Sequence, residues 1–221
     1  MTQAKLNKEP PRFIAVEGPI GVGKTSLSRR LAESFNYDLL LEQVEHNPFL
    51  ERFYQNPRRY ALAAQLFFLF QRAQQMQELR QDDIFKPVRV ADFLMEKDEL
   101  FARVNLDKDE YALYLNVYQH LIIDPPPPDL VIYLQASTDV LLERIQRRGV
   151  PAEQLIEVDY LENLNKAYAE FFHHYKSSAL LIVNSTDIDP VHDEHDYQQL
   201  LDYILNLPSG THYFNPRPAL L

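Results

Sequence analysis

The stretch VEGPIGVGKTS (residues 16–26) contains the full pattern G-x-x-x-x-G-K-[ST] of a phosphate-binding loop. Its required positions are occupied by Gly18, Gly23, Lys24 and Thr25. The apolar run FIAV (13–16) precedes the loop, and a helical pattern follows from Lys24, with an apolar residue at every fourth position from Leu27 to Phe35. A strand, a glycine-rich loop and a helix in this order are the structural context that the motif requires.

The residue types of this loop suit a nucleotide polyphosphate. Glycines let successive backbone N–H groups turn inward around the phosphates, and the N-terminus of the following helix adds the positive end of its dipole. Lys24 places a cation on the terminal phosphates, and Thr25 can hold a magnesium ion. We therefore predict that the nucleotide is bound by Gly18, Pro19, Ile20, Gly21, Val22, Gly23, Lys24, Thr25 and Ser26.

Four further apolar runs of strand length follow, at residues 39–41, 88–92, 130–134 and 180–183, and helical patterns separate them. The longest helical pattern runs from about residue 58 to residue 80. Alternating strands and helices predict a P-loop α/β fold with a five-stranded parallel sheet flanked by helices. Ligands bind such sheets at the carboxyl ends of the strands.

The chain of 221 residues is long enough for one sizeable core, and we expect a single domain over residues 13–208. Residues 1–12 carry basic side chains without an apolar stretch behind them, so we expect a disordered lead-in rather than a secretory signal. Residues 209–221 are expected to form a C-terminal tail.

The composition of the chain limits its possible partners and its cellular compartment. The net charge of −10 argues against a general nucleic-acid binder, which needs a basic surface, but it allows a local basic pocket for a small phosphate ligand. No apolar run approaches the roughly 18 residues that a membrane-spanning helix needs, so no membrane association is expected. Cysteine is absent, which excludes disulfides and thiolate metal sites and favours a reducing cytoplasm.

Chemistry-bearing residues follow the predicted strands and line the predicted helices. Glu42 in LLLEQVEHNPFL (39–50) ends the second apolar run, so the sheet would present its carboxylate at the ligand edge, with Glu45 as a weaker candidate. In FYQNPRRYALAAQLFFLFQRA (53–73), Gln65 and Arg72 lie seven apart and share one helix face. An amide that carries both a donor and an acceptor suits the edge of a nucleobase.

A cluster of arginines ends another helical pattern, in LLERIQRRGVPAEQLIEVDYLENL (141–164). Arg144 and Arg148 are four apart and share a face, so both can reach one polyphosphate, whereas Arg147 points elsewhere. The helix leads into a loop that starts at Gly149. We expect residues 144–156 to form a short arginine-rich lid.

In their joint order these segments resemble the deoxyribonucleoside kinases, and the similarity is closest to the bacterial deoxyadenosine/deoxyguanosine type. The resemblance covers about residues 13–185. It implies that ATP is the phosphate donor, that Mg²⁺ is needed, and that the chain forms a homodimer packed through its long helices. It also implies that Glu42 is the general base for the sugar 5′-hydroxyl and that Gln65 and Arg72 read the base.

Further roles follow from the same resemblance. Tyr54 matches the tyrosine that hydrogen-bonds the sugar 3′-hydroxyl and crowds the 2′ position, and Glu153 matches a lid glutamate that reaches the same 3′-hydroxyl. Asp98 falls where the family keeps an aspartate paired with the base-selecting arginine, here Arg72. Arg148 and Arg144 match lid arginines that neutralise charge on the donor phosphates.

One segment departs from the family pattern. Many members carry Glu-Arg-Ser or Asp-Arg-Ser after the third strand, whereas this chain has Asp92-Phe93-Leu94 in VRVADFLMEKDELFARVNL (88–106). Asp92 can replace the acid near magnesium, so we expect Thr25 and Asp92 to serve the metal. Phe93 cannot replace a guanidinium, and Lys97 is the nearest cation that can fill the gap.

These observations predict an ATP-dependent deoxynucleoside kinase of nucleotide salvage that acts on deoxyadenosine or deoxyguanosine, leaves deoxycytidine open and uses thymidine poorly. A nucleoside monophosphate kinase, such as a thymidylate kinase, is one alternative, but Phe93 stands where cations for a second phosphate would be needed. A non-catalytic nucleotide-sensing protein is another alternative, and it would need neither Glu42 nor the lid arginines.

Overall fold

A computed structural model of the chain describes residues 10–82, 88–121 and 126–216. Residues 1–9, most of the segment predicted to be a disordered lead-in, lie outside the described residues. Within the described residues, no helix combines the length and the apolar character needed to cross a membrane.

The centre of the molecule is one parallel sheet with the strand order β2-β3-β1-β4-β5-β6. Its strands are β1 (Phe13–Glu17), β2 (Asp38–Leu40), β3 (Arg89–Ala91), β4 (Leu130–Gln135), β5 (Ala179–Asn184) and β6 (Thr211–Phe214). In the register of the central pair, Ala15 of β1 lies opposite Val131 of β4. The predicted parallel α/β fold is confirmed.

The sheet has six strands, so the prediction of five was wrong. The additional strand, β6, lies within the segment predicted to be a tail and pairs with β5 at the edge of the sheet. Its sequence THYF has only one buried residue, Phe214, whereas the inner strands are almost wholly buried. A short edge strand without a continuous apolar run lacks the pattern by which buried strands are detected.

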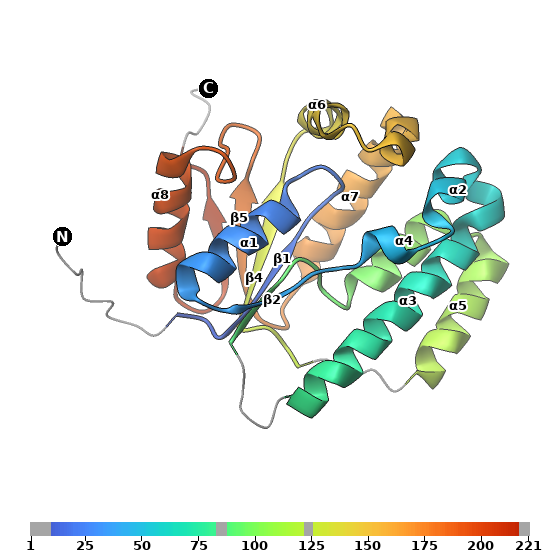
Figure 1. Cartoon of the computed structure of the whole chain (residues 1–221), viewed down its shortest axis with the longest axis horizontal. Coiled ribbons are helices and arrows are strands. Elements are labelled where there is room, and N and C mark those ends of the chain that lie inside the picture. The colour runs from blue at the N-terminus through green and yellow to red at the C-terminus, as the bar shows by residue number, and fades with distance from the viewer. Residues whose placement is uncertain (1–9, 83–87, 122–125, 217–221) are drawn as a thin grey trace.

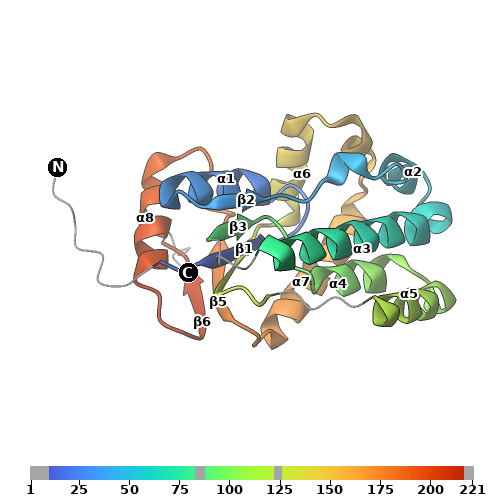
Figure 2. The ribbon, with the colours of Figure 1, turned by 60° about the horizontal axis from the view of Figure 1, so that its bottom comes forward.

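Helices cover both faces of the sheet (Figure 1). They are α1 (Lys24–Phe35), α2 (Leu50–Gln55), α3 (Pro57–Asp82), α4 (Lys97–Asn105), α5 (Lys108–His120), α6 (Thr138–Arg148), α7 (Val158–His174) and α8 (Glu194–Leu205), with short 3₁₀ turns η1 (Val44–His46) and η3 (Pro151–Leu155). The helices α5 and α8 lie at opposite ends of the molecule (Figures 1 and 2).

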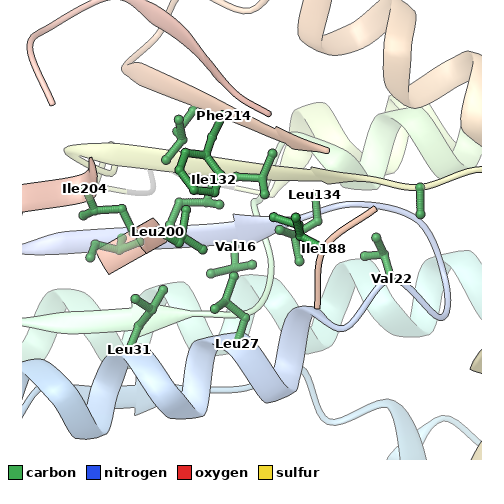
Figure 3. Close-up of a cluster of buried hydrophobic side chains, with 14 of the residues drawn as sticks. Val16, Val22, Leu27, Leu31, Ile132, Leu134, Ile188, Leu200, Ile204 and Phe214 are labelled. Atoms are coloured by element: carbon green, nitrogen blue, oxygen red, sulfur yellow. The ribbon is translucent and has the colours of Figure 1, made fainter. Parts of the chain in front are cut away.

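The alternation of side chains along the strands creates two cores. On one face, residues such as Val16 and Ile132 pack against α1 and α8, through Leu27 and Leu200 among others (Figure 3). On the other face, Tyr133 of β4 stacks on Phe172 of α7, with ring centroids 4.2 Å apart. Because both faces are buried, the central strands read as continuous apolar runs.

Two local features place the phosphate-binding loop. Gly18 has a φ of 150°, and a Cβ there would lie 2.5 Å from the carbonyl oxygen of Leu134, so only glycine permits this close approach to β4. Gly23 caps α1 in the left-handed region, with a φ of 104°. No side chain caps the N-terminus of α1, so its first backbone N–H groups remain available to an anion.

Candidate active site

A cavity of about 600 Å³ lies beside the phosphate-binding loop, a volume that suits a small-molecule ligand. Among the residues predicted for the site, those that line it are Ile20, Gly21, Lys24, Thr25, Glu42, Tyr54, Gln65, Arg72, Asp92, Lys97, Arg148 and Glu153. The remaining predicted residues do not line it: Gly18, Pro19, Val22, Gly23, Ser26, Asp98 and Arg144. Residues from the loop, the long helix and the lid segment therefore meet in one place.

Lys24 lines this cavity from the start of α1. Its ammonium donates hydrogen bonds to the carbonyl oxygens of Gly18, at 2.7 Å, and Pro19, at 3.1 Å. Burial and the nearby charge of Lys97 lower the pKa of Lys24 to about 8, although Glu17, Glu42 and Asp92 act in the opposite direction. The Lys24 ammonium is therefore held against the loop, and it loses its proton at a lower pH than an ordinary lysine.

Thr25 and Asp92 meet at the carboxyl ends of β1 and β3. The hydroxyl of Thr25 donates to Asp92 Oδ2 at 2.5 Å, and the backbone N–H of Glu42 donates to Asp92 Oδ1 at 2.7 Å. A hydroxyl and a carboxylate are hard oxygen ligands of the kind that Mg²⁺ prefers. Because nucleotide phosphates and water complete the octahedron around Mg²⁺, one or two protein oxygens suffice. These two side chains fit a nucleotide-bound magnesium ion.

The carboxylate of Glu42 is almost buried and is held by two cations. Arg72 donates to Oε1 through Nε at 2.9 Å and also through Nη2, and Lys97 donates to Oε2 at 2.9 Å. Burial disfavours the charge on Glu42, but the charges and hydrogen bonds of Arg72 and Lys97 outweigh it and lower the pKa to about 2. Glu42 is therefore ionised throughout the physiological pH range. Glu45 also lines the cavity, but within the described residues its carboxylate forms no ion pair with a lysine or an arginine.

Lys97 stands where the sequence lacks the family's arginine. Phe93 is buried in a hydrophobic cluster with residues such as Leu69 and Tyr114, so its side chain belongs to the core. The ammonium of Lys97, at the first residue of α4, lies against Glu42 and 3.7 Å from Glu17 Oε2. Lys97 therefore places a cation beside the Glu42 carboxylate; that it takes the place of the missing arginine stays a prediction.

The predicted base-reading residues lie together on α3 and α4. Gln65 donates to the backbone oxygen of Asp98 at 2.9 Å, and Arg72 forms an ion pair with the Asp98 carboxylate, as the resemblance implies. Asp98 is completely buried and also accepts from the hydroxyl of Tyr114 at 2.7 Å. Asp98 therefore acts on the cavity through Arg72, which its carboxylate binds, and through Gln65, which its backbone oxygen binds. Arg72 contacts both Glu42 and Asp98, a double contact that the helical spacing did not reveal.

Aromatic and lid residues close the cavity on another side. Burial raises the pKa of Tyr54 well above its usual value, so the hydroxyl stays protonated and able to donate. Arg148 pairs with Glu153 across the turn that follows α6. Of the three phenylalanines near Arg72 on α3, Phe68 lines the cavity, whereas Phe70 is 52% exposed. Phe68 is placed to stack on a bound ring.

Arg144 lies apart from Arg148. Its guanidinium donates to the backbone oxygens of Val22, at 3.2 Å, and Ser185, at 2.8 Å. The side chain therefore ties α6 to the phosphate-binding loop and to the segment after β5. The two arginines share a helix face as predicted, but they point to different partners in this conformation.

Glu17 is a site residue that the sequence analysis missed. It is fully buried at the end of β1 and accepts hydrogen bonds from the backbone of Gly18, the backbone of Leu94 and the hydroxyl of Tyr168, each at 2.9 Å. The same signal that selected Glu42 and Asp92, an acidic residue where a predicted strand ends, was also available for Glu17. The Glu17 carboxylate links the phosphate-binding loop, through Gly18, to the segment that leads to Lys97, through Leu94.

Comparisons with known proteins agree with this geometry. A model of the deoxynucleoside kinase family matches residues 14–207. The chain is 34% identical to a deoxyguanosine kinase of Bacillus subtilis (strain 168) over 208 residues, which cover 91% of this chain and 99% of the relative. It is 29% identical to a deoxyadenosine/deoxycytidine kinase of the same organism over 205 residues, 88% of this chain and 92% of the relative.

The fold also matches solved structures. The deoxyadenosine kinase from M. mycoides, solved with dCMP and a flexible dCDP bound, has a TM-score of 0.77 and 27% identity, with coverage of 88% of this chain and 100% of that one. These matches do not favour a nucleoside monophosphate kinase or a nucleotide-sensing protein. The chain therefore belongs to the deoxynucleoside kinase family and is an ATP-dependent phosphotransferase.

Proposed function

We propose that this kinase transfers the γ-phosphate of MgATP to the 5′-hydroxyl of a purine deoxynucleoside, deoxyadenosine or deoxyguanosine, in nucleotide salvage. The main support is that Glu42 lines one cavity together with Lys24, from the start of α1, and with Gln65 and Arg72 of α3. A hydroxyl placed beside Glu42 would lie between a triphosphate on the loop and a base against α3.

In this step the 5′-oxygen attacks the γ-phosphorus in line, the bond from that phosphorus to the β,γ-bridging oxygen breaks, and the hydroxyl proton passes to Glu42. The products are ADP and the deoxynucleoside monophosphate. Glu42, with a pKa of about 2, is a weak base. We infer that it chiefly orients the hydroxyl and accepts the proton late, which suits a loose phosphoryl transition state.

We infer that side chains lining the cavity neutralise the charge of the phosphates. Lys24 would contact the β- and γ-phosphates, and Arg148 would release Glu153 and turn to the transferring group as the lid closes. Thr25 and Asp92 would hold Mg²⁺, which supplies neutralisation of the β- and γ-oxygens when bound. Glu153, freed from Arg148, would then be available to the sugar 3′-hydroxyl beside Tyr54.

The proposed base preference rests on the polar pair at the end of the cavity. Arg72 with Asp98 suits a base that presents a ring nitrogen or an exocyclic amine, whereas the 5-methyl group of thymine would press against the pair. Relatives named as deoxyguanosine, deoxyadenosine and deoxyadenosine/deoxycytidine kinases support a purine and leave deoxycytidine open. Tyr54 would crowd a 2′-hydroxyl, which favours deoxyribose over ribose.

A panel of eight nucleosides, four deoxyribonucleosides and four ribonucleosides, tests the proposal with MgATP and chromatographic identification of the products. We expect the highest kcat/KM for deoxyadenosine or deoxyguanosine and a low value for thymidine. Thymidine as the best substrate would overturn the base preference. Phosphorylation of monophosphates in place of nucleosides would overturn the proposed acceptor.

We also propose that the protein is a cytoplasmic homodimer packed through its long helices. Phe70 on α3 and Leu113 on α5 are each 52% exposed and offer apolar surface for such an interface. Analytical ultracentrifugation of the protein would give twice the chain mass if this is correct.

A further inference from the structure

The segment that carries Glu42 is not part of a regular element. The strand β2 ends at Leu40, and the 3₁₀ turn η1 begins at Val44, so residues 41–43 lie between them. The backbone N–H of Glu42 donates to Asp92. Of the carbonyl oxygens on either side of Glu42, that of Gln43 accepts the backbone N–H of His46 in η1 at 3.1 Å, whereas that of Leu41 accepts no backbone hydrogen bond within the described residues. Few backbone hydrogen bonds hold this segment, so the position of the Glu42 carboxylate also depends on side chains that bind the flanking carbonyls.

Two glutamines from the long helix bind both of them. Gln75 Nε2 donates to the carbonyl oxygen of Leu41 at 3.1 Å, and Gln71 Nε2 donates to the carbonyl oxygen of Gln43 at 3.2 Å. Gln71 and Gln75 are four apart on α3, a rise of about 6 Å. This rise is close to the roughly 6.6 Å between alternate residues of an extended chain, so one helix face can contact both carbonyls.

The acceptor ends of the same amides find no partner. Among the described residues, Gln71 Oε1 and Gln75 Oε1 are buried without a hydrogen bond. A buried oxygen without a donor is costly, so an amide is a poor choice for stability at these positions. The donor nitrogens alone are satisfied, and both are directed at the backbone beside Glu42.

The intervening residue on the helix completes the arrangement. Arg72 directly follows Gln71 and lies three residues before Gln75, and it binds the carboxylate of Glu42 itself. The helix α3, which carries the proposed base-reading residues, therefore binds the Glu42 carboxylate and the backbone carbonyls on both sides of it. A shift of α3 would move the carboxylate with the base-reading residues.

We propose that Gln71 and Gln75 are positioning residues that fix the Glu42 segment to α3, so that the carboxylate keeps its place relative to a nucleoside bound against the same helix. They act through Glu42 and do not touch the substrate. This inference rests on the proposed role of Glu42 as the group that orients the 5′-hydroxyl.

The test uses the variants Gln71→Met, Gln75→Met and the double variant, because methionine keeps the length of the side chain and removes the donor. Gln74→Met is the matched control, since Gln74 lies on the same helix, is exposed and donates to Glu78 instead. We expect the double variant to lose about tenfold in kcat, within the range for a misplaced catalytic group, with the nucleoside KM within about twofold of wild type. Gln74→Met should match the wild type.

A melting-temperature measurement separates positioning from folding. Each single variant loses one weak hydrogen bond and removes one unpaired acceptor, so the melting temperature should change by no more than about 4 °C. Gln71→Glu provides a second variant at a half-exposed position, where the shape is kept and the donor is lost. It should show the same selective fall in kcat.

A double-mutant cycle with Glu42→Gln decides whether the glutamines act through Glu42. In the Glu42→Gln background, Gln71→Met and Gln75→Met should cause little further loss of kcat. Two outcomes would overturn this inference alone. One is that the losses of kcat from the glutamine variants and from Glu42→Gln multiply independently. The other is that the glutamine variants keep the wild-type kcat while Glu42→Gln loses most of it. A fully active Glu42→Gln enzyme would instead overturn the proposed function on which it rests.

Discussion

Lys97 Nζ lies 2.9 Å from Glu42 Oε2, and the two side chains are only 3% and 10% exposed. An ammonium and a carboxylate in such a buried setting interact more strongly than a surface ion pair. Lys97 enters the site from the N-terminus of α4, five residues after Asp92, whereas the family pattern that the sequence resembles has an arginine directly after the acid. The charge is kept, but the planar fork of a guanidinium is replaced by a point charge.

The variant Lys97→Met should therefore cripple catalysis, and Lys97→Arg should retain part of it. Loss of one cation lets burial raise the pKa of Glu42 from about 2 towards or above its ordinary value of 4.5. As the pH falls through that raised pKa, Glu42 becomes protonated, so kcat/KM for the nucleoside should acquire an acid limb that the wild type lacks above about pH 4. An active Lys97→Met enzyme with a wild-type pH profile would return Lys97 to a purely structural role.

Replacement of Glu42 by glutamine keeps the size of the side chain but removes the charge that we propose orients and deprotonates the 5′-hydroxyl. We expect kcat to fall by about 10²-fold or more, with little change in nucleoside affinity, because general base catalysis typically contributes 10²–10⁴-fold. Steady-state kinetics and nucleoside titration of the same preparation check this. Glu45→Gln, which alters a carboxylate in the same cavity, is the control and should stay active.

The lowered pKa of Lys24, about 8, predicts a basic limb in kcat/KM for ATP. The charged form is lost as the pH rises through the pKa of the free enzyme, so binding and capture of ATP should decline above about pH 8. Bound phosphates favour the charged lysine, so kcat at saturating ATP should decline only at higher pH. In Lys24→Arg, which remains charged, the activity should be lower but the basic limb near pH 8 should disappear.

Arg148→Ala should lower kcat more than it weakens nucleoside binding, since charge on the transferring phosphoryl group develops in the transition state. A loss of about 10²-fold would be typical of one removed charge stabiliser. Arg147→Ala is the matched control, because its exposed side chain does not line the cavity. A selective loss of nucleoside affinity in Arg148→Ala would contradict the lid role.

The Arg72 and Asp98 pair, which we propose selects the base, is also buried and should contribute to stability. Asp98→Ala leaves the Tyr114 hydroxyl and part of the Arg72 guanidinium unpaired in the core, so we expect about 3 kcal/mol of destabilisation in urea unfolding. The combined change Arg72→Met and Asp98→Ala should cost less than Asp98→Ala alone, because it leaves no buried unpaired charge.

The combined variant should also shift the ratio of kcat/KM values towards thymidine. Its absolute kcat should fall with every nucleoside, since Glu42 loses one of its two cations. The ratio is therefore the decisive measurement. An unchanged preference would show that the pair does not select the base.

Local patterns in the sequence determined the phosphate-binding loop, the α/β class and the acidic residues at the ends of β2 and β3. Each depends on a contiguous segment: a strand, a glycine turn and a helix, or a carboxylate where an apolar run stops. Such elements can be detected from the sequence because the spacing of apolar side chains along a strand or a helix depends only on neighbouring residues. The sixth strand was missed because β6 carries no such period.

Partners across the site were decided only by the tertiary structure. Helical spacing showed that Arg144 and Arg148 share a face, but not that one binds backbone oxygens and the other binds Glu153. It likewise placed Gln65 and Arg72 on one side of α3 without revealing that Arg72 holds Glu42. The interaction between two charges depends on their separation and burial, and these are set by the packing of segments far apart in the chain.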